Sequence, residues 1–216
     1  MHVRYNPVAQ PVGAGSRYVS EEGESMQQLT EIRWHARAGQ GAVTAAKLVA
    51  ETALELDQYI QAMPEYGPER MGAPIQAFTR ISPQPIEIHC NIENPNVVVV
   101  LDESLLATVD VARGVTDDGV VIVNTCKTPG QIRTELGLGG GKVACVDASG
   151  IALETLKRDI PNTPMIGALA KATGLFDLQP VIDHLQKTFG KKFTQDVIDA
   201  NVACVTRAFE EVAIDG

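Results

Sequence analysis

Residues 29–59 constrain the fold more than any other stretch, because they read in turn as a strand, a tight turn and a helix. Ile32 and Trp34 give the first part its apolar, β-forming character, and a run of small residues follows. From Ala42 onward, apolar residues recur at i, i+3 and i+4, the spacing of an amphipathic helix. A strand that enters a helix through small residues is the opening unit of nucleotide-binding α/β folds.

The turn departs from the glycine pattern G-x-G-x-x-G that binds dinucleotides. Ala36 and Ala38 occupy the first two glycine positions, and only Gly41 matches. The missing glycines normally permit a tight turn and the close approach of a pyrophosphate. The favoured interpretation is therefore a close helix–strand corner. An anion site at residues 39–41 stays open as the alternative, since a helix N-terminus presents unpaired N–H groups.

Residues 97–101, 119–123 and 142–146 are continuous apolar segments, typical of parallel strands that are buried on both faces. Each is followed by polar residues and a helical pattern, which is the alternation of an α/β fold. Helices are expected at residues 105–112, 128–136, 149–157, 164–173, 178–189 and 193–212. We predict one domain over residues 29–216. It is a three-layer, Rossmann-like, mostly parallel sheet flanked by helices, with a small antiparallel hairpin and a helical C-terminus.

The hairpin is expected where prolines separate two β-forming segments. Residues 75–82 predict one strand, and residues 85–90 are expected to return beside it. A further short strand is expected at residues 58–63. Arg80, in the first of these strands, is either an exposed edge charge or part of a face that contacts a ligand or another subunit.

Residues 64–74 combine conformational restriction with ionic groups, since they contain three prolines, two glycines, two glutamates and one arginine. Such a loop holds charged side chains in a fixed pose, so we favour a binding loop. The alternative is a surface loop that proline stiffens.

Polar residues follow the first two buried strands: Asp102 after one and Asn124 after the other. Ligands of open α/β sheets bind beyond the carboxyl ends of the strands, so both are candidate site residues. Asp102 also fits the cap of a following helix, and capping is the favoured interpretation of this residue.

The charge of the chain argues against several classes of partner. The formal net charge is −9 over 216 residues, which opposes non-specific binding to nucleic acid and to anionic membranes. No apolar run reaches the length of a transmembrane helix, and the start of the chain lacks the apolar segment of a secretory signal. The expected compartment is the cytoplasm. Residues 1–28 are expected to form a flexible extension or to wrap a neighbouring subunit.

The four cysteines are Cys90, Cys126, Cys145 and Cys204, and none belongs to a C-x-x-C pair. No iron–sulfur cluster is expected, because cluster ligands are normally closely spaced. Cys126 and Cys145 lie in or just after apolar runs, so we expect buried, inert thiols. The histidines lack partners at ligand spacing, and no metal site is predicted.

Two motifs resemble one known family. Residues 34–43 (WHARAGQGAV) are similar to the turn of the gamma subunit of 2-oxoacid:ferredoxin oxidoreductases, in particular pyruvate synthase. Residues 66–74 (YGPERMGAP), followed by residues 78–82 (FTRIS), resemble the second characteristic segment of that family. The resemblance extends over about residues 31–212. The family turn has glycines at two positions where this chain has alanine.

The resemblance implies the reaction of a whole complex: oxidative decarboxylation of a 2-oxoacid, pyruvate first among the candidates, to an acyl-CoA with electrons passed to ferredoxin. It places thiamine diphosphate with Mg between the alpha and beta subunits, and iron–sulfur clusters in the delta and beta subunits. The gamma subunit then binds no cofactor of its own and is not catalytic in isolation. Its partners are the alpha, beta and delta subunits, and CoA is a substrate of the complex.

The residues expected to face CoA or partner subunits come from the turn, the proline-rich loop and the neighbouring strands. They are Arg37, Gly39, Gln40, Gly41, Glu65, Gly67, Pro68, Glu69, Arg70, Gly72 and Arg80, with Asp102 and Asn124 as a strand-end site. No catalytic residue is predicted. Two other hypotheses stay open: a stand-alone Rossmann-like nucleotide-binding oxidoreductase, and a self-associating scaffold.

Overall fold

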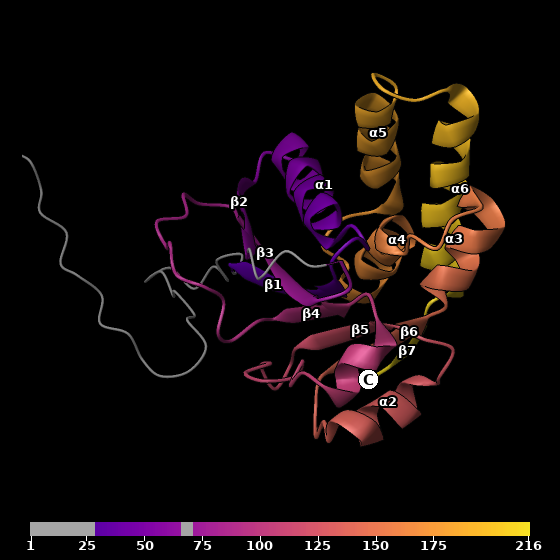
Figure 1. The fold of residues 1–216 in the computed structure, drawn as a ribbon. Helices are drawn as coiled ribbons and strands as arrows, with labels where there is room; N and C mark the ends of the chain where they lie inside the picture. Colours follow the sequence, from indigo (N-terminus) through magenta and orange to yellow (C-terminus); the bar gives the residue numbers. More distant parts are fainter. Residues whose placement is uncertain (1–28, 66–70) are drawn as a thin grey trace, which may run out of the picture.

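The computed structural model describes residues 29–65 and 71–216 and shows a seven-stranded sheet in the order β2-β3-β1-β4-β5-β6-β7 (Figure 1). The strands are β1 (Thr30–Arg37), β2 (Tyr59–Glu65), β3 (Pro74–Ser82), β4 (Val97–Val100), β5 (Val120–Asn124), β6 (Lys142–Val146) and β7 (Ala213–Asp215). The helices are α1 (Ala42–Glu55), the short 3₁₀ helix η1 (Glu103–Ala107), α2 (Pro129–Leu136), α3 (Ala148–Leu156), α4 (Asn162–Thr173), α5 (Leu178–Phe189) and α6 (Gln195–Glu211).

The centre of the sheet is parallel, and layers of helices and loops cover its strands on both faces. The strands β1, β4, β5 and β6 pair in parallel, and all four residues of β4 are buried. Valine, with its β-branched side chain, favours this doubly covered position. The strands β2, β3 and β7 join antiparallel toward the two edges. The predicted fold class, a mostly parallel α/β sheet with helices around it, is confirmed.

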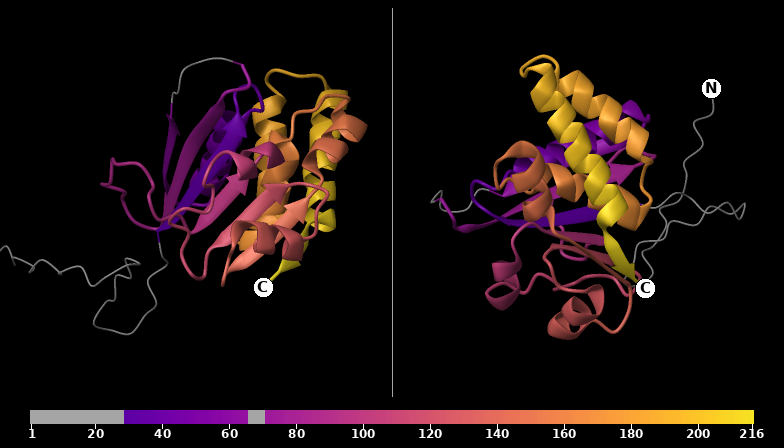
Figure 2. Two further views of the ribbon diagram at one scale, coloured as in Figure 1. Left: turned by 60° about the horizontal axis from the view of Figure 1, so that its bottom comes forward. Right: turned by 90° about the vertical axis from the view of Figure 1, so that its right-hand side faces the viewer.

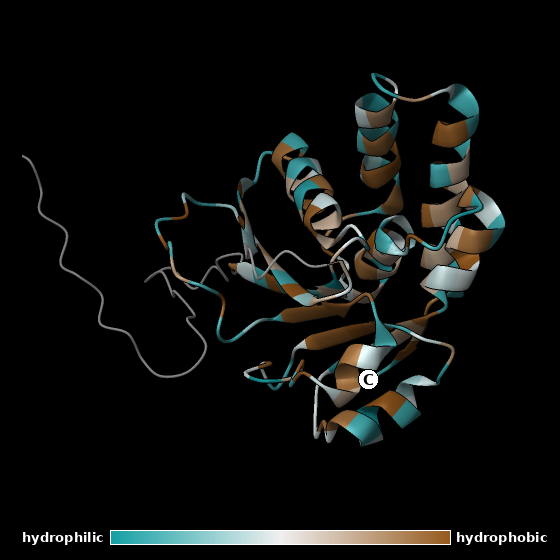
Figure 3. Cartoon of the chain, in the orientation of Figure 1, coloured by the Kyte–Doolittle hydropathy of each residue, from teal (hydrophilic) through white to brown (hydrophobic). Residues whose placement is uncertain are grey.

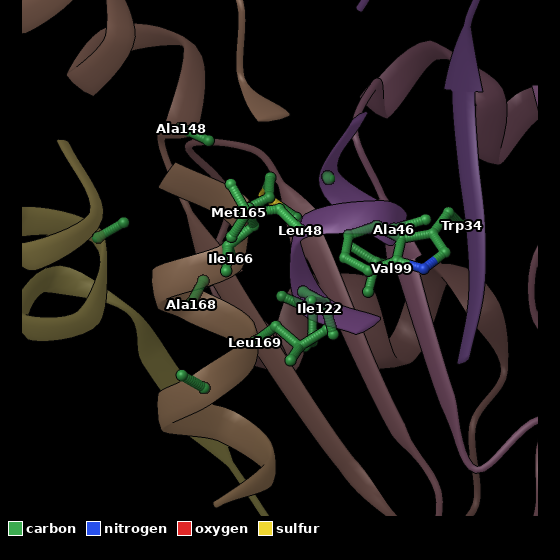
Figure 4. Packing of buried hydrophobic residues seen from close by; sticks show 14 of the residues in the cluster. Trp34, Ala46, Leu48, Val99, Ile122, Ala148, Met165, Ile166, Ala168 and Leu169 are labelled. Carbon is green, nitrogen blue, oxygen red and sulfur yellow. The ribbon is translucent and has the colours of Figure 1, made fainter. Parts of the chain in front are cut away.

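Helices cover both faces of the sheet and make three layers (Figures 1 and 2). The helices α1, α3, α4, α5 and α6 pack on one face over the larger apolar core, and η1 and α2 cover a smaller core on the other. Apolar residues concentrate on the central strands between these layers (Figure 3). Leu169 of α4 lies beside Ile122 of β5, and both are fully buried (Figure 4). Burial of one such side chain contributes about 1.5–3 kcal/mol.

The predicted hairpin partner is wrong. Residues 85–90 form no strand, and β3 pairs instead with β2 on one side and β1 on the other. The physical reason is that both edges of β3 are already occupied, so no ladder position is left for a returning strand. The antiparallel hairpin of this fold is therefore β2 with β3.

Two other elements differ from the sequence prediction. The helix expected at residues 105–112 is the short 3₁₀ helix η1, after which tight turns such as the bond from Val111 N–H to the Val109 carbonyl take over. The β-branched residues Thr108, Val109 and Val111 have low helix propensity, which explains the early end. The edge strand β7 was not predicted, because three residues carry no periodic signal.

The predicted burial of Cys126 is also wrong. This thiol is exposed, because β5 ends at Asn124 and leaves Cys126 beyond the sheet. Cys145 is buried as predicted, as is Cys204. Burial raises the pKa of the Cys145 thiol to about 12, so that it stays protonated and unreactive near neutral pH.

Over the described residues, no helix combines the length and the apolar character needed to cross a membrane. The predicted N-terminal extension, residues 1–28, lies outside the described residues.

Candidate functional site

The carboxyl ends of β1 and β4 lie side by side, because these parallel strands pair as far as His35 with Val100. After β1 the chain passes to β2 and β3 on one side, and it then returns to β4 on the other side of β1. The order of the strands therefore changes direction between β1 and β4. In open α/β sheets this switch point is where ligands bind.

The side chain of Gln40 closes the turn from β1 into α1. Gln40 N–H donates to the Arg37 carbonyl (3.1 Å), and Arg37 N–H donates back to Gln40 Oε1 (2.8 Å). Gly39 and Gly41 have φ values of 104° and 82°, which a side chain would strain. The structure thus shows a tight corner between strand and helix.

A second segment is bound to this corner. The N–H of Ala38 donates to the Ala73 carbonyl (2.9 Å), and the N–H of Gly72 donates to the Ala38 carbonyl (3.2 Å). Gly72 has a φ of 85°, and the neighbouring Met71 is 93% exposed. The end of the proline-rich loop is therefore held against the turn. Met71 is an exposed apolar residue there that the sequence patterns did not single out.

The N-terminus of α1 presents free amide groups at this corner. The first intrahelical bond runs from Ala45 N–H to the Gly41 carbonyl, so the amides of residues 42–44 have no intrahelical acceptor. Gly41 has no side chain that could cap them, and the first turn of α1 contains no acidic residue. The helix dipole makes this end positive, which favours an anionic group by about 0.3–1 kcal/mol.

Asp102 connects β4 to the turn. Its carboxylate accepts two hydrogen bonds. The first comes from the Ser104 N–H (2.9 Å) and caps η1, and the second comes from the Gln40 side-chain amide (2.8 Å). The Arg37 guanidinium lies 3.4 Å from the same carboxylate. Partial burial opposes ionisation, but the bonds from Ser104 and Gln40 and the charge of Arg37 outweigh it and lower the pKa of the Asp102 carboxyl. The predicted capping role is confirmed.

Arg37 joins all three segments. Its Nε and Nη2 donate to Ser104 Oγ (3.0 and 2.7 Å), and its Nη1 donates to the Gly72 carbonyl (3.0 Å). Its side chain remains 31% exposed despite these bonds. Ser104 was missed as a partner of Arg37, because nothing local in the sequence relates residues so far apart.

Asn124 is held inside the fold. Its Nδ2 donates to the Leu101 carbonyl (2.9 Å) and to Ser149 Oγ (3.1 Å), and its Oδ1 accepts the Ser149 N–H (3.1 Å). The residue is buried, and these bonds tie β4, β5 and the start of α3 together. The structure thus gives Asn124 a bracing role at the strand ends.

Arg80 lies at the other end of the sheet. It is 1% exposed, and it donates to Glu31 Oε1 (2.7 Å) and Gln61 Oε1 (2.9 Å). Glu31 is near the start of β1, whereas Arg37 ends that strand, so Arg80 cannot share a surface with the turn. The interpretation of Arg80 as an exposed edge charge is wrong, since the β2 strand and residue Ile88 cover it.

The other predicted loop residues cannot be placed in this way. Gly67, Pro68, Glu69 and Arg70 lie outside the described residues, and of Glu65 the structure gives only the backbone at the end of β2. Over the described ranges, no group of three or more His, Cys, Asp or Glu side chains could hold a metal ion.

We use the term turn face for Arg37, residues 39–41, Gly72, Asp102 and Ser104.

Comparison with known proteins decides the family. Residues 31–211 match the family described as pyruvate ferredoxin/flavodoxin oxidoreductase. The chain belongs to this family. Pyruvate synthase subunit PorC of Thermotoga maritima is 50% identical over 182 residues, which are 84% of this chain and 94% of that relative. The pyruvate/ketoisovalerate oxidoreductases common subunit gamma of Thermococcus kodakarensis is 53% identical over 161 residues, 74% of this chain and 87% of that relative.

A solved structure agrees with this placement in the pyruvate ferredoxin/flavodoxin oxidoreductase family. The crystal structure of pyruvate oxidoreductase subunit PORC from Thermotoga maritima superposes with a TM-score of 0.78 at 46% identity, covering 88% of this chain and 100% of that one. The predicted family, the gamma type of subunit and the membership of an oxidoreductase are confirmed. The stand-alone nucleotide-binding oxidoreductase is not favoured.

Proposed function

We propose that this gamma subunit serves a complex that converts pyruvate and CoA to acetyl-CoA and CO₂ while reducing ferredoxin, and that its own contribution is the turn face. In this proposal the alpha, beta and delta subunits carry the thiamine diphosphate, Mg and iron–sulfur clusters. The cytoplasm is the proposed compartment, on the sequence argument alone.

The turn face is suited to an anionic partner. The uncapped N-terminus of α1 points its amides to this corner, and Arg37 adds a permanent positive charge within reach of solvent. Asp102 offsets part of the Arg37 charge at 3.4 Å, whereas the first turn of α1 contains no acidic residue to offset its amides. A phosphate of CoA, or a carboxylate of a partner subunit, would accept from both the amides and the guanidinium.

The single observation that carries the proposal is the position of Arg37 at the switch point of the sheet, where Ser104 and Gly72 fix it and its side chain stays partly exposed. Guanidinium groups bind phosphates and carboxylates through two parallel hydrogen bonds, which lysine cannot reproduce. Arg70, although outside the described residues, is proposed for the same kind of contact. Arg70→Ala in the assembled complex tests that separate role.

The experiment for the turn face is Arg37→Ala in the co-expressed complex, with Arg37→Lys as the conservative variant. We expect intact assembly and a KM for CoA raised about tenfold with little change in kcat, the pattern of lost ground-state binding. Arg207→Ala is the control and should change neither value, since this half-buried arginine of α6 pairs with Glu154 and Glu211 away from the turn face. Loss of co-purification, with an unchanged KM in whatever complex still assembles, would assign the face to a partner subunit. No effect on either would refute both roles.

A further inference from the structure

A cavity of about 90 Å³ lies at the amino ends of β5 and β6. Its wall comes from two segments, residues 112–121, which lead into β5, and residues 138–142, which lead into β6. The turn face lies at the opposite end of the sheet, because β1, β4, β5 and β6 run in parallel and the turn face follows their carboxyl ends. The volume equals that of about three water molecules at about 30 Å³ each, so the cavity has room for a molecule of a few non-hydrogen atoms.

Backbone contacts hold the two segments of the wall at a fixed distance. A Cβ on Gly140 would lie 2.8 Å from the Asp117 carbonyl oxygen, so a side chain at residue 140 would not fit. Arg133 Nη1 donates to the Gly140 carbonyl (3.0 Å) and fixes this segment from outside. On the other segment, the Gly119 N–H donates to the Thr116 carbonyl (2.8 Å). The cavity therefore has a defined shape before any ligand binds.

One buried polar atom of the wall lacks a partner. The Thr116 hydroxyl oxygen is buried, and within the described residues it makes no hydrogen bond. An unpaired buried hydroxyl destabilises a fold, so native proteins keep few of them. Because Thr116 lines the cavity, a bound molecule can supply the missing partner.

Two opposite charges also line the cavity without pairing. Asp117 and Lys142 are both exposed residues of the wall. In the part of the chain that the structure describes, neither side chain forms an ion pair or a hydrogen bond, whether with the other or with a third residue. A ligand that carries one positive and one negative group can pair with both at once. Val115, Val121 and Leu138 make part of the wall apolar.

We propose that this cavity binds a small α-amino acid with an apolar side chain, of about the size of alanine. The carboxylate of the ligand pairs with the Lys142 ammonium and accepts from the Thr116 hydroxyl, and its ammonium group pairs with Asp117. Its side chain contacts Val115 and Leu138. A simple carboxylate or a simple amine uses only one of the two charges and binds more weakly. Binding here is independent of the function of the turn face.

Thermal unfolding of the full chain with L-alanine tests the site. For a Kd of about 1 mM, about 10 mM L-alanine should raise the Tm by about 3–6 °C, because the ligand binds the folded chain. Propionate and ethylamine each lack one of the charges, so binding about tenfold weaker should limit the rise to about 1–2 °C. An equal rise with propionate would indicate a site for simple carboxylates and would overturn the proposal. The same holds if L-alanine causes no rise up to about 100 mM.

Matched variants of the full chain locate the binding. Asp117→Asn should weaken the binding of L-alanine about tenfold, whereas Asp118→Asn changes a neighbouring exposed aspartate outside the wall and should leave binding unchanged. Equal weakening in both variants would place the amino acid elsewhere and refute the site.

Thr116→Val separates a ligand-binding role from a structural one. Without ligand it should raise the Tm by about 2–4 °C, because the unpaired hydroxyl is removed, and it should also weaken the binding of L-alanine. A purely structural hydroxyl would give a lower Tm in this variant, and that result would overturn the proposal.

Discussion

Gln40 donates a 2.8 Å hydrogen bond from its side-chain amide to the Asp102 carboxylate, and this bond joins the turn after β1 to the end of β4. The same side chain accepts the Arg37 N–H through its oxygen. One amide thus satisfies a backbone donor and a carboxylate acceptor on two different strands. The shape of the turn face therefore depends on this residue as well as on the glycines that flank it.

Gln40→Ala should therefore destabilise the protein by about 1–2 kcal/mol, because two hydrogen bonds are lost together. Gln40→Glu should cost more near neutral pH. It keeps the acceptor for Arg37, but it places a second carboxylate against Asp102 in place of a donor. Urea unfolding of the two variants measures the difference. If Gln40→Glu were as stable as the natural chain, the bond to Asp102 would not be formed.

Gly167→Ala should destabilise the packing of α4 on α6 by at least about 1–3 kcal/mol. A Cβ at residue 167 would lie 2.1 Å from the Val205 carbonyl oxygen, and the backbone of α6 cannot move aside without disturbing the core. Gly130→Ala in α2 is the matched control, since a Cβ there meets nothing within 4 Å. The control should be neutral or stabilising by about 0.5–1 kcal/mol. Thermal unfolding of both variants gives the comparison.

His35 should make the free energy of unfolding fall as the pH is lowered. Burial, with the charge of Arg33 beside it, lowers the pKa of the His35 imidazole to about 3. Between about pH 6.5 and pH 3 the unfolded chain binds a proton that the folded chain does not. The contribution of His35 is therefore complete above that range and is lost as the pH falls through it.

His35→Gln removes this titration and keeps an acceptor for the Arg33 Nε–H, which donates to His35 Nε2 at 3.1 Å. The slope of unfolding free energy against pH should then be shallower between pH 6.5 and 3, by up to about 1.4 kcal/mol per pH unit. Urea unfolding at several pH values compares the two chains. If the two plots of unfolding free energy against pH were parallel, His35 would be taking up its proton in the folded chain over the same pH range as in the unfolded chain.

Glu31→Ala should be among the most damaging single changes, because it leaves the Arg80 guanidinium buried without a counter-charge. Removing one partner of a buried ion pair costs about 3–5 kcal/mol, whereas replacing both by apolar residues is often neutral. The double variant Glu31→Met with Arg80→Met should thus recover most of the loss. The partial exposure of Glu31, 21% of its side chain, places the expected cost at the lower end. A double-mutant cycle in urea measures the coupling.

Much of the fold was predictable because its signals are local. A few neighbouring residues are enough to predict the buried strand β4, the helix start at Thr128 and Pro129, and the end of α5 before Gly190. The pairing of β3 was not predictable from residues 75–90, since the identity of its neighbours depends on where β1 and β2 lie. Strand pairing is a non-local choice that periodicity does not encode.

In the candidate site, too, local features were predictable and contacts between distant residues were not. The sequence placed Asp102 as a cap and found the unusual turn, because both are short patterns. It could not show that Arg37 binds Ser104, nor that Arg80 is buried against Glu31, since these partners are distant in the chain. From sequence alone, a charged residue in a strand is predicted to be exposed, because the counter-charge on the neighbouring strand is not known.

Gly41 meets Asn162 at the point where the first turns of α1 and α4 come together. A Cβ on Gly41 would lie 2.7 Å from Asn162 Nδ2, so the two positions share a fixed volume. The φ of 82° at Gly41 would strain a side chain there even if residue 162 were smaller. Two independent constraints, the backbone conformation and the neighbouring helix, therefore keep residue 41 a glycine. An engineer who alters the turn for a new ligand must leave Gly41 in place and change the residues around it.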